Sequence, residues 1–273
     1  LPGKQELCFY SDSVEEATKA IREAEIFIHL DFNTLSRVGE DMARVLRENT
    51  DAKTILIDHH QQPDEFDEML SVTTASSTAE LVYEFCKSLA PDTQIDLDIA
   101  ANLYTGIITD TGSFRYSSTG ANTHAIAAEF HKLGLNTAGI DQMIYDSSSF
   151  HRLKLIGYAL SEKMEVFEDG KASLISLTQG ELTRHNYIKG DTEGLVNYGL
   201  SMAGVEVTAF FREAEDGSVK ISFRSKNDVD VNQFARSFFN GGGHKNAAGG
   251  RVELPVNEAI ALYKENIAAW LSK

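Results

Sequence analysis

The tripeptide Asp58-His59-His60 is the part of the sequence best suited to chemistry. It follows residues 54–57, TILI, whose β-branched and apolar side chains predict a short buried strand. In open α/β sheets, polar groups just beyond the carboxyl end of a strand face a crevice where ligands bind. Because imidazole and carboxylate groups are usual ligands of Mn, Zn and Fe, the tripeptide indicates a metal site. The alternative is a solvated loop that happens to contain two histidines.

Two further carboxylates end apolar segments and could join this site. Asp31 ends the run IFIHLD, and Asp110 follows the mostly apolar helical pattern of residues 97–108. A pair of divalent metals needs several carboxylates, one of which can bridge them, and one or two imidazoles. Taken alone, either aspartate could be a helix cap. Taken together with His59, they favour metal binding.

A second cluster, the glycine-rich segment NGGGHKNAAGG, has the composition of an anion site. Consecutive glycines let backbone N–H groups come close to an anion, and the following His and Lys add donors and charge. The segment is not a Walker loop, because no Gly-Lys-Ser/Thr follows. The candidate residues are Gly241, Gly242, Gly243 and His244, with Arg224 in the expected strand ISFRSK. The alternative for the glycines is a tight connection between elements, and the alternative for Arg224 is a solvated side chain on a strand.

The first half of the chain alternates helical and strand patterns, which predicts βαβ units and a parallel sheet. Parallel strands present their carboxyl ends at one edge, so Asp31 and Asp58 should lie on the same rim. We expect strands at residues 26–31, 54–57 and 72–75, and helices at residues 13–24, 35–49, 79–89, 97–108, 122–133 and 140–145.

From residue 164 the hydrophobic period changes to two, which predicts hairpins. Their turns, Asp169-Gly170 and Asp216-Gly217, are of types that favour positive φ. A short helix, the glycine-rich turn and a closing amphipathic helix at residues 256–271 complete an α+β domain. The expected fold is therefore α/β, with a parallel-sheet domain at residues 1–148, a connector helix at residues 149–163 and a smaller α+β domain at residues 164–273.

Composition narrows the classes of function. The net charge of −16 argues against long duplex nucleic acid as a partner, because such binding depends on neutralising phosphates. Residues 1–162 hold 26 of the 41 acidic residues and 12 of the 25 basic ones, a balance that suits divalent cations. The alternative is that surface acids only maintain solubility. No apolar run reaches the ~18 residues of a membrane helix, and the start lacks a signal-peptide pattern, so we expect a cytoplasmic protein without a membrane partner.

Four segments, IFIHLD, ILIDHHQQP, GIITDTGSFRY and NGGGHKNAAGG, occur in an order and at distances that resemble the DHH phosphoesterase superfamily. The resemblance covers essentially the whole chain. It is strongest to the bacterial branch that carries a DHH-associated C-terminal domain, the nanoRNase or phosphoadenosine-phosphate phosphatase type. In that family two divalent metals, usually Mn²⁺ with Mg²⁺ or Co²⁺ as alternatives, activate a water molecule that attacks a phosphoester.

The resemblance implies a role for each candidate residue of the first half. Asp31, His59 and Asp110 would be metal ligands, with Asp31 able to bridge two metals. Asp58 would orient the imidazoles, as groups that hydrogen-bond to metal ligands commonly do. His60 would face the scissile phosphate.

The resemblance also implies how the substrate is held. The C-terminal domain of the family binds the terminal phosphate and nucleotide across an interdomain cleft. In this chain the glycine run with His244 and Arg224 would bind the phosphate, and Arg115 would be a further phosphate contact. The implied activity converts short single-stranded oligoribonucleotides to mononucleotides and 3'-phosphoadenosine 5'-phosphate to AMP. Pyrophosphate, polyphosphate, and cyclic or linear dinucleotides are alternative substrates, and a homodimer is compatible with the family.

One departure from the family pattern concerns metal binding. The family's first motif, a His followed by Pro-Asp-x-Asp, has no counterpart before Asp31. We expect that the chain begins about one βα unit late and that the preceding segment supplies these ligands. The alternative is a non-catalytic nucleotide-binding protein that has kept phosphate recognition.

Overall fold

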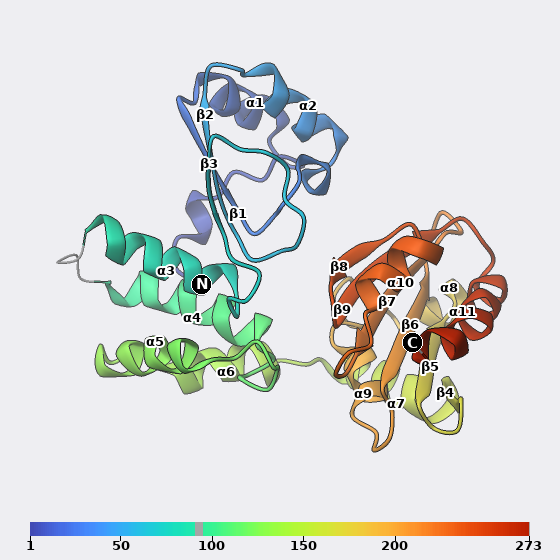
Figure 1. Ribbon diagram of the computed structural model, residues 1–273. Coiled ribbons are helices and arrows are strands. Elements are labelled where there is room, and N and C mark those ends of the chain that lie inside the picture. Colours follow the sequence, from blue (N-terminus) through green and yellow to red (C-terminus); the bar gives the residue numbers. More distant parts are fainter. Residues whose placement is uncertain (91–94, 273) are drawn as a thin grey trace. The chain divides into compact units, whose positions relative to one another are not determined.

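The computed structural model describes residues 1–90 and 95–272 (Figure 1). The chain divides into two compact units, Leu1–Asp146 and Ser147–Lys273. Each unit has its own sheet and its own hydrophobic core. Within the described residues, no helix has both the length and the apolar character that a membrane span requires.

The first unit contains a parallel sheet, as predicted, with strands in the order β1-β2-β3. Apolar runs at the expected positions form its first two strands, β1 and β2. In chain order its elements are η1 (Lys4–Glu6), α1 (Val14–Glu23), β1 (Ile26–Leu30), η2 (Leu35–Val38), α2 (Glu40–Glu48), β2 (Lys53–Asp58), β3 (Glu68–Ser71), α3 (Thr78–Leu89), α4 (Leu97–Asp110), α5 (Ala121–Lys132) and α6 (Thr137–Tyr145).

The register of this sheet brings the first two acidic strand ends together. Leu30 of β1 pairs with Ile57 of β2, and the N–H of the next residue, Asp31, donates to the Ile57 carbonyl at 3.3 Å. Asp58 is the last residue of β2 and pairs with Ser71 of β3. The carboxyl edge of the sheet therefore carries both aspartates, as the sequence predicts.

Two hydrophobic clusters support this edge. Helices α1 and α2 pack together beside the sheet, where Ile21, Val45 and Leu46 form a small core (Figure 1). Helices α3 to α6 form a larger core, and α3 also packs against β2. In this larger core Ile107 and Ile108 are fully buried, so the last turn of α4 is fixed and Asp110 is held at a defined place.

Two predicted elements of the first unit differ in the structure. The helix expected at residues 35–49 is interrupted at Gly39, whose φ of 86° is incompatible with a helix, and forms η2 and α2 instead. The third strand was expected at residues 72–75, but the structure has no strand there and places the third strand, β3, at Glu68–Ser71. Because β3 is an edge strand, it can contain the acidic Glu68. An acidic residue at its start interrupts the apolar run by which a strand is recognised in the sequence.

The second unit is built around a six-stranded mixed sheet in the order β4-β5-β6-β7-β9-β8, in which β5 and β6 are parallel and the other neighbours antiparallel. Both predicted hairpins are present. Helices α8 and α9 were not predicted, because six residues are too few to show a helical period. The elements are α7 (Phe150–Glu162), β4 (Met164–Phe167), β5 (Ala172–Leu177), α8 (Gln179–Arg184), α9 (Leu195–Leu200), β6 (Val207–Glu213), β7 (Val219–Ser225), α10 (Val231–Phe238), β8 (Gly242–His244), β9 (Ala247–Val252) and α11 (Val256–Leu271).

The two faces of this sheet differ along β7. Val219, Ile221 and Phe223 are buried in the core formed with α10 and α11. The alternate residues of β7 therefore point to the opposite face. Part of that opposite face is covered by α7, α8 and α9, whose apolar residues pack on β5 and β6. Helix α7, expected as a connector, thus contributes to the core of the second unit.

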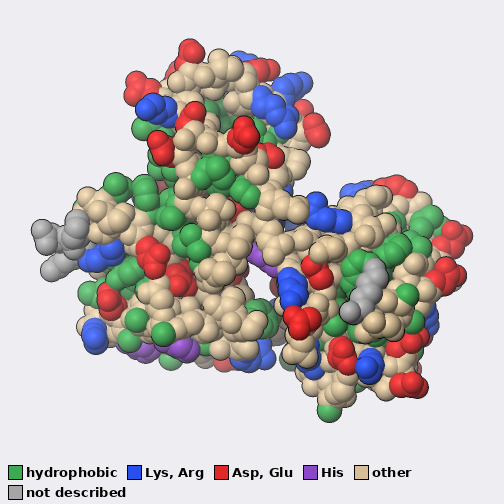
Figure 2. Space-filling model, viewed as in Figure 1, with side chains coloured by type: hydrophobic (Ala, Val, Ile, Leu, Met, Phe, Trp, Pro, Cys, Tyr) green, Lys and Arg blue, Asp and Glu red, His purple; other side chains and the backbone are tan. Residues whose placement is uncertain are grey.

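Charge is mixed on the surface of each unit. On the face shown in Figure 2, acidic and basic side chains are interspersed over the elements of both units. The net charge of −16 is therefore not gathered into a single acidic patch on that face.

Candidate functional site

His59 lies between two of the predicted metal-binding carboxylates. Its Nε2 is 3.7 Å from Asp31 Oδ1 and 3.6 Å from Asp110 Oδ2. On the other side of the ring, Nδ1 lies 3.3 Å from the carbonyl of Ala75. Because a carbonyl can only accept a hydrogen bond, Nδ1 donates to Ala75, and Nε2 faces the two carboxylates. This orientation directs Nε2 toward the place where the two carboxylates could hold a metal.

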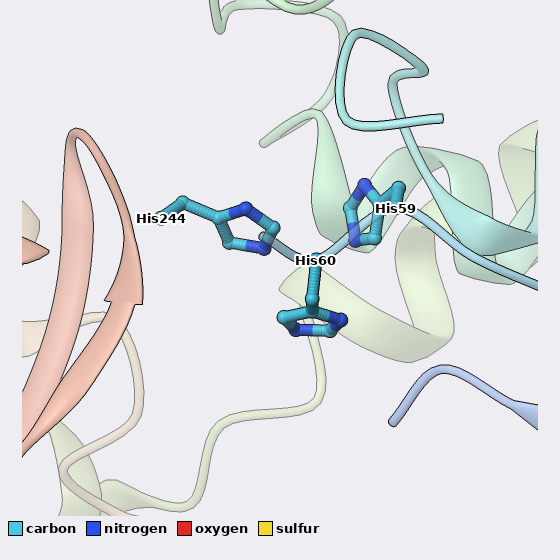
Figure 3. Close-up of side chains that lie close together, drawn as sticks. All are labelled: His59, His60 and His244. Carbon is cyan, nitrogen blue, oxygen red and sulfur yellow. The ribbon is translucent and has the colours of Figure 1, made fainter. Parts of the chain in front are cut away.

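His60 makes a different set of contacts. Its Nδ1 lies 2.7 Å from Asp58 Oδ1, so it donates to a fully buried carboxylate. Although His59 and His60 are adjacent in the chain, their rings are oriented differently, with an interplanar angle of 79° (Figure 3). The hydrogen bond to Asp58 fixes the orientation of the His60 ring through Nδ1.

Asp58 organises both histidines. Its Oδ1 also accepts the backbone N–H groups of His59 at 2.8 Å and His60 at 3.2 Å. Burial alone would raise the pKa of Asp58, but the hydrogen bonds and charge of His60 and the backbone N–H groups outweigh burial and lower it. Asp58 is therefore ionised. Its Oδ2 is buried and has no hydrogen-bond partner among the described residues, which suits the binding of a cation.

Asp31 is held in a strained conformation. Its φ is 64°, in the left-handed region that non-glycine residues seldom occupy. Such strain persists where the surrounding structure fixes it, and it is concentrated at functional sites. The side chain is 56% exposed, and its Oδ1 accepts a hydrogen bond from the Thr78 hydroxyl at 2.8 Å.

Asp110 is the last residue of α4, where the partial negative charge of the helix end disfavours a second negative charge. Burial raises the pKa of Asp110, and the nearby Asp31 carboxylate raises it further, against the opposite effect of the two histidines. A carboxylate in this setting is stabilised by a nearby cation.

These residues fit the metal that the family requires. One ligand atom from each of Asp31, His59 and Asp110 lies within 4.8 Å of the others, and an overlapping set is formed by Asp31, Asp58 and His60. Oxygen and imidazole nitrogen donors of this kind suit Mn²⁺, Fe²⁺ and Zn²⁺. The unpartnered Oδ2 of Asp58 supports the same conclusion.

Arg115 follows this centre in a strained loop. Gly112, Ser113 and Phe114 all have positive φ, between 56° and 63°. The Arg115 Nε donates to the Gly112 carbonyl at 2.7 Å, so the side chain stabilises the loop that follows Asp110. Any phosphate contact by Arg115 would use its terminal guanidinium nitrogens.

The second unit has a basic pocket of about 360 Å³ on the open face of its sheet. Arg224 lines this pocket. A row of basic residues four positions away along β7, on the same face of the sheet, was not predicted. Arg212, Lys220 and Arg251 pair directly across β6, β7 and β9, so their side chains share one face. The alternation of β7 from Arg224 through Ser222 to Lys220 could have identified this row. The lining residues are Thr192, Glu193, Gly194, Val196, Phe210, Arg212, Lys220, Ile221, Ser222, Arg224, Gly249, Gly250 and Arg251.

The glycine run is required by close packing of the backbone. A Cβ on Gly241 would lie 1.9 Å from the Gly249 carbonyl oxygen, so strands β8 and β9 can approach only with glycine here. The N–H of Gly241 donates to Ala235, and that of Gly243 donates to Asn232.

The remaining members of the run lie in β8 itself. Gly242 pairs with Gly249, and His244 pairs with Ala247. His244, labelled in Figure 3, is thus carried by a strand of the second unit rather than by the turn that the sequence suggested.

Comparisons with known proteins agree with this arrangement. Residues 4–107 match the family model "DHH family, N-terminal domain", and residues 173–273 match the model "DHHA1 domain". The chain is 32% identical to a probable bifunctional oligoribonuclease and PAP phosphatase of Streptococcus mutans, over 86% of this chain and 73% of that protein. It is 29% identical to a cyclic-di-AMP phosphodiesterase of Geobacillus thermodenitrificans, over 93% of this chain and 37% of that protein.

A solved structure is also similar. An exopolyphosphatase-related protein from Bacteroides fragilis superposes with a TM-score of 0.92 at 36% identity, covering 100% of this chain and 80% of that chain. The α/β fold and the family predicted from the sequence are therefore confirmed. The chain belongs to the DHH family, in the group that carries a DHHA1 domain, and like its family it is a metal-dependent phosphoesterase.

Proposed function

We propose that this enzyme hydrolyses short oligoribonucleotides to mononucleotides and converts 3'-phosphoadenosine 5'-phosphate to AMP. The observation that supports the proposal most strongly is the set of ligand atoms from Asp31, His59 and Asp110 within 4.8 Å of one another. The similarity to an oligoribonuclease and PAP phosphatase over 73% of that protein supports the choice of substrates.

In this proposal the first unit provides the chemistry. Asp31, His59 and Asp110 hold divalent metal, for which Mn²⁺ is our first choice. When bound, the metal would supply an activated water and neutralise charge on the phosphate. Asp58 keeps the His60 ring oriented through its 2.7 Å hydrogen bond, and His60 donates to the scissile phosphate or its leaving oxygen.

The second unit provides substrate recognition in the same proposal. Arg224 and the row of Arg212, Lys220 and Arg251 carry positive charge on one face of the sheet, as a phosphodiester requires. Arg224 and Lys220 lie four residues apart on β7, about 13 Å along the strand, so this surface is long enough to contact more than one phosphate of an extended strand. His244 supplies a further donor.

A substrate panel tests the proposal. With Mn²⁺, we expect a ribodinucleotide and 3'-phosphoadenosine 5'-phosphate to be hydrolysed at least ~10-fold more efficiently, by kcat/KM, than tripolyphosphate or cyclic di-AMP. The physical reason for the preference over tripolyphosphate is that a basic pocket with Ser222, Gly249 and Gly250 leaves room beside the phosphate for a ribose and base, which tripolyphosphate lacks. Products are resolved by chromatography. Preferential cleavage of tripolyphosphate would show a polyphosphatase, and preferential cleavage of cyclic di-AMP a cyclic-dinucleotide phosphodiesterase.

A further inference from the structure

The turn that leads into α3 contacts the candidate metal centre at two points. The Ala75 carbonyl accepts a hydrogen bond from His59 Nδ1, and the Thr78 hydroxyl donates to Asp31 Oδ1 at 2.8 Å. We propose that Thr78 is a positioning residue that orients the Asp31 carboxylate for metal binding, and that the buried Glu80 fixes Thr78 in place. The inference rests on the proposed metal centre.

The Thr78 hydroxyl is directed to Asp31 by its surroundings. Thr78 is the first residue of α3 and is 5% exposed. The usual work of a hydroxyl at a helix start, accepting a backbone N–H, is done by the preceding Ser77, which accepts from Glu80 N at 3.2 Å. The one hydroxyl proton of Thr78 is therefore available to a carboxylate. Thr78 Oγ1 lies 2.8 Å from Asp31 Oδ1 and 3.4 Å from Asp58 Oδ1, so Asp31 is the better acceptor.

Orientation matters more for Asp31 than for the other proposed ligands. Its side chain is 56% exposed, whereas the side chain of Asp110 is 37% exposed and that of His59 is 10% exposed. An exposed carboxylate is free to rotate unless a hydrogen bond holds it. The Thr78 hydroxyl fixes Oδ1, the oxygen that lies 3.7 Å from His59 Nε2, and a neutral hydroxyl, unlike Lys or Arg, does not compete with the metal for the negative charge.

Glu80 is the anchor of this turn. It is 7% exposed, and its Oε2 accepts from Ser76 N at 3.3 Å, from the Ser76 hydroxyl, and from Thr123 Oγ1 at 2.9 Å. Its Oε1 accepts from Asn122 Nδ2 at 2.7 Å. Burial would raise the pKa of Glu80, but these hydrogen bonds outweigh it and lower the pKa, so the carboxylate is charged.

The donors to Glu80 connect the metal centre to a distant helix. Asn122 and Thr123 belong to the first turn of α5, and Ser76 lies two residues before Thr78. A buried charge held by neutral donors alone depends on keeping all of them, because each lost hydrogen bond leaves it less compensated. The position of Thr78 relative to Asp31 is therefore fixed by packing of α3 against α5 and not by the loop alone.

The test measures Mn²⁺ affinity, by the electron paramagnetic resonance signal of free Mn²⁺, in the full-length protein. Thr78→Val keeps the shape of the side chain and removes the hydroxyl, and we expect it to weaken Mn²⁺ binding about 10- to 100-fold. Thr78→Ser keeps the hydroxyl, so its affinity should stay within about threefold of the wild type. Thr137→Val is the matched control, because Thr137 is also the first residue of a helix, is 6% exposed, and bonds to His131 instead.

The outcomes separate the inference from the proposed function on which it rests. If Thr78→Val binds Mn²⁺ as the wild type does while Asp110→Asn loses it, the role of Thr78 is refuted and the metal centre stands. If Asp110→Asn also binds normally, the proposed metal centre itself is wrong. A lower melting temperature with unchanged affinity in Thr78→Val would mean a purely structural role and would also overturn the inference. Should Thr78→Val fail to fold, Thr78→Ala gives the same comparison.

Discussion

Replacing Asp110 with Asn is expected to lower kcat by roughly 10³-fold on a ribodinucleotide, a loss of about 4 kcal/mol of transition-state stabilisation. Asn has nearly the shape of Asp but no charge, so the end of α4 would lose the group that faces His59 Nε2 at 3.6 Å. Mn²⁺ affinity should fall with activity. The kcat is measured by steady-state kinetics, and the Mn²⁺ affinity is measured by equilibrium binding.

The control for this substitution lies on the same helix. Asp98, in the first turn of α4, lies at the opposite end of the helix from Asp110, about 18 Å away along the helix axis. Asp98→Asn should leave kcat within about twofold of the wild type, because one charge near an exposed helix start contributes at most about 1 kcal/mol to stability. If Asp110→Asn has the kcat of the wild type, Asp110 is not a metal ligand.

Substitution of the two adjacent histidines is expected to give two different defects. His59→Ala should lose Mn²⁺ binding, because His59 Nε2 is the nitrogen that lies between Asp31 and Asp110. His60→Ala should keep Mn²⁺ affinity within about threefold while kcat falls by about 10²- to 10³-fold, the usual effect of removing a group that moves a proton. Binding and kcat are measured on the same preparations.

The two histidines serve as controls for each other. They are adjacent, of the same type, and similarly buried, with His59 8% and His60 9% exposed. A general loss of stability would affect both variants alike. Loss of Mn²⁺ binding in His60→Ala with normal binding in His59→Ala would reverse the proposed roles.

The part of the site that depends on strand ends could be predicted from the sequence. Apolar runs that stop at Asp31 and Asp58 give parallel strands, and parallel strands place their carboxyl ends together, so the approach of these carboxylates follows from topology. Asp110 was predicted for a similar reason, since an apolar helix that ends at a carboxylate fixes its position.

The contacts that support the site could not be predicted in this way. A threonine at a helix start is expected to be a cap, and only the structure shows that Ser77 takes that role and leaves Thr78 for Asp31. The burial of Glu80 depends on Asn122 and Thr123, more than 40 residues away, and no local pattern indicates it.

The glycine run shows a different limit of sequence reasoning. Consecutive glycines are compatible with close approach to an anion or with close approach to another strand, and the sequence does not distinguish the two. A Cβ on Gly241 would lie 1.9 Å from the Gly249 carbonyl oxygen, so close approach to another strand requires glycine here. Lys220 could have been found, because it lies on the same face of β7 as Arg224.

The most direct test of the central claim is to locate bound Mn²⁺ by anomalous diffraction at the manganese edge, in crystals of the protein grown with MnCl₂. We predict that the strongest anomalous peak is coordinated by carboxylate oxygens of Asp31 and Asp110 and by Nε2 of His59. A strongest peak that contacts none of these three residues, or no peak in crystals of active protein, would contradict the account.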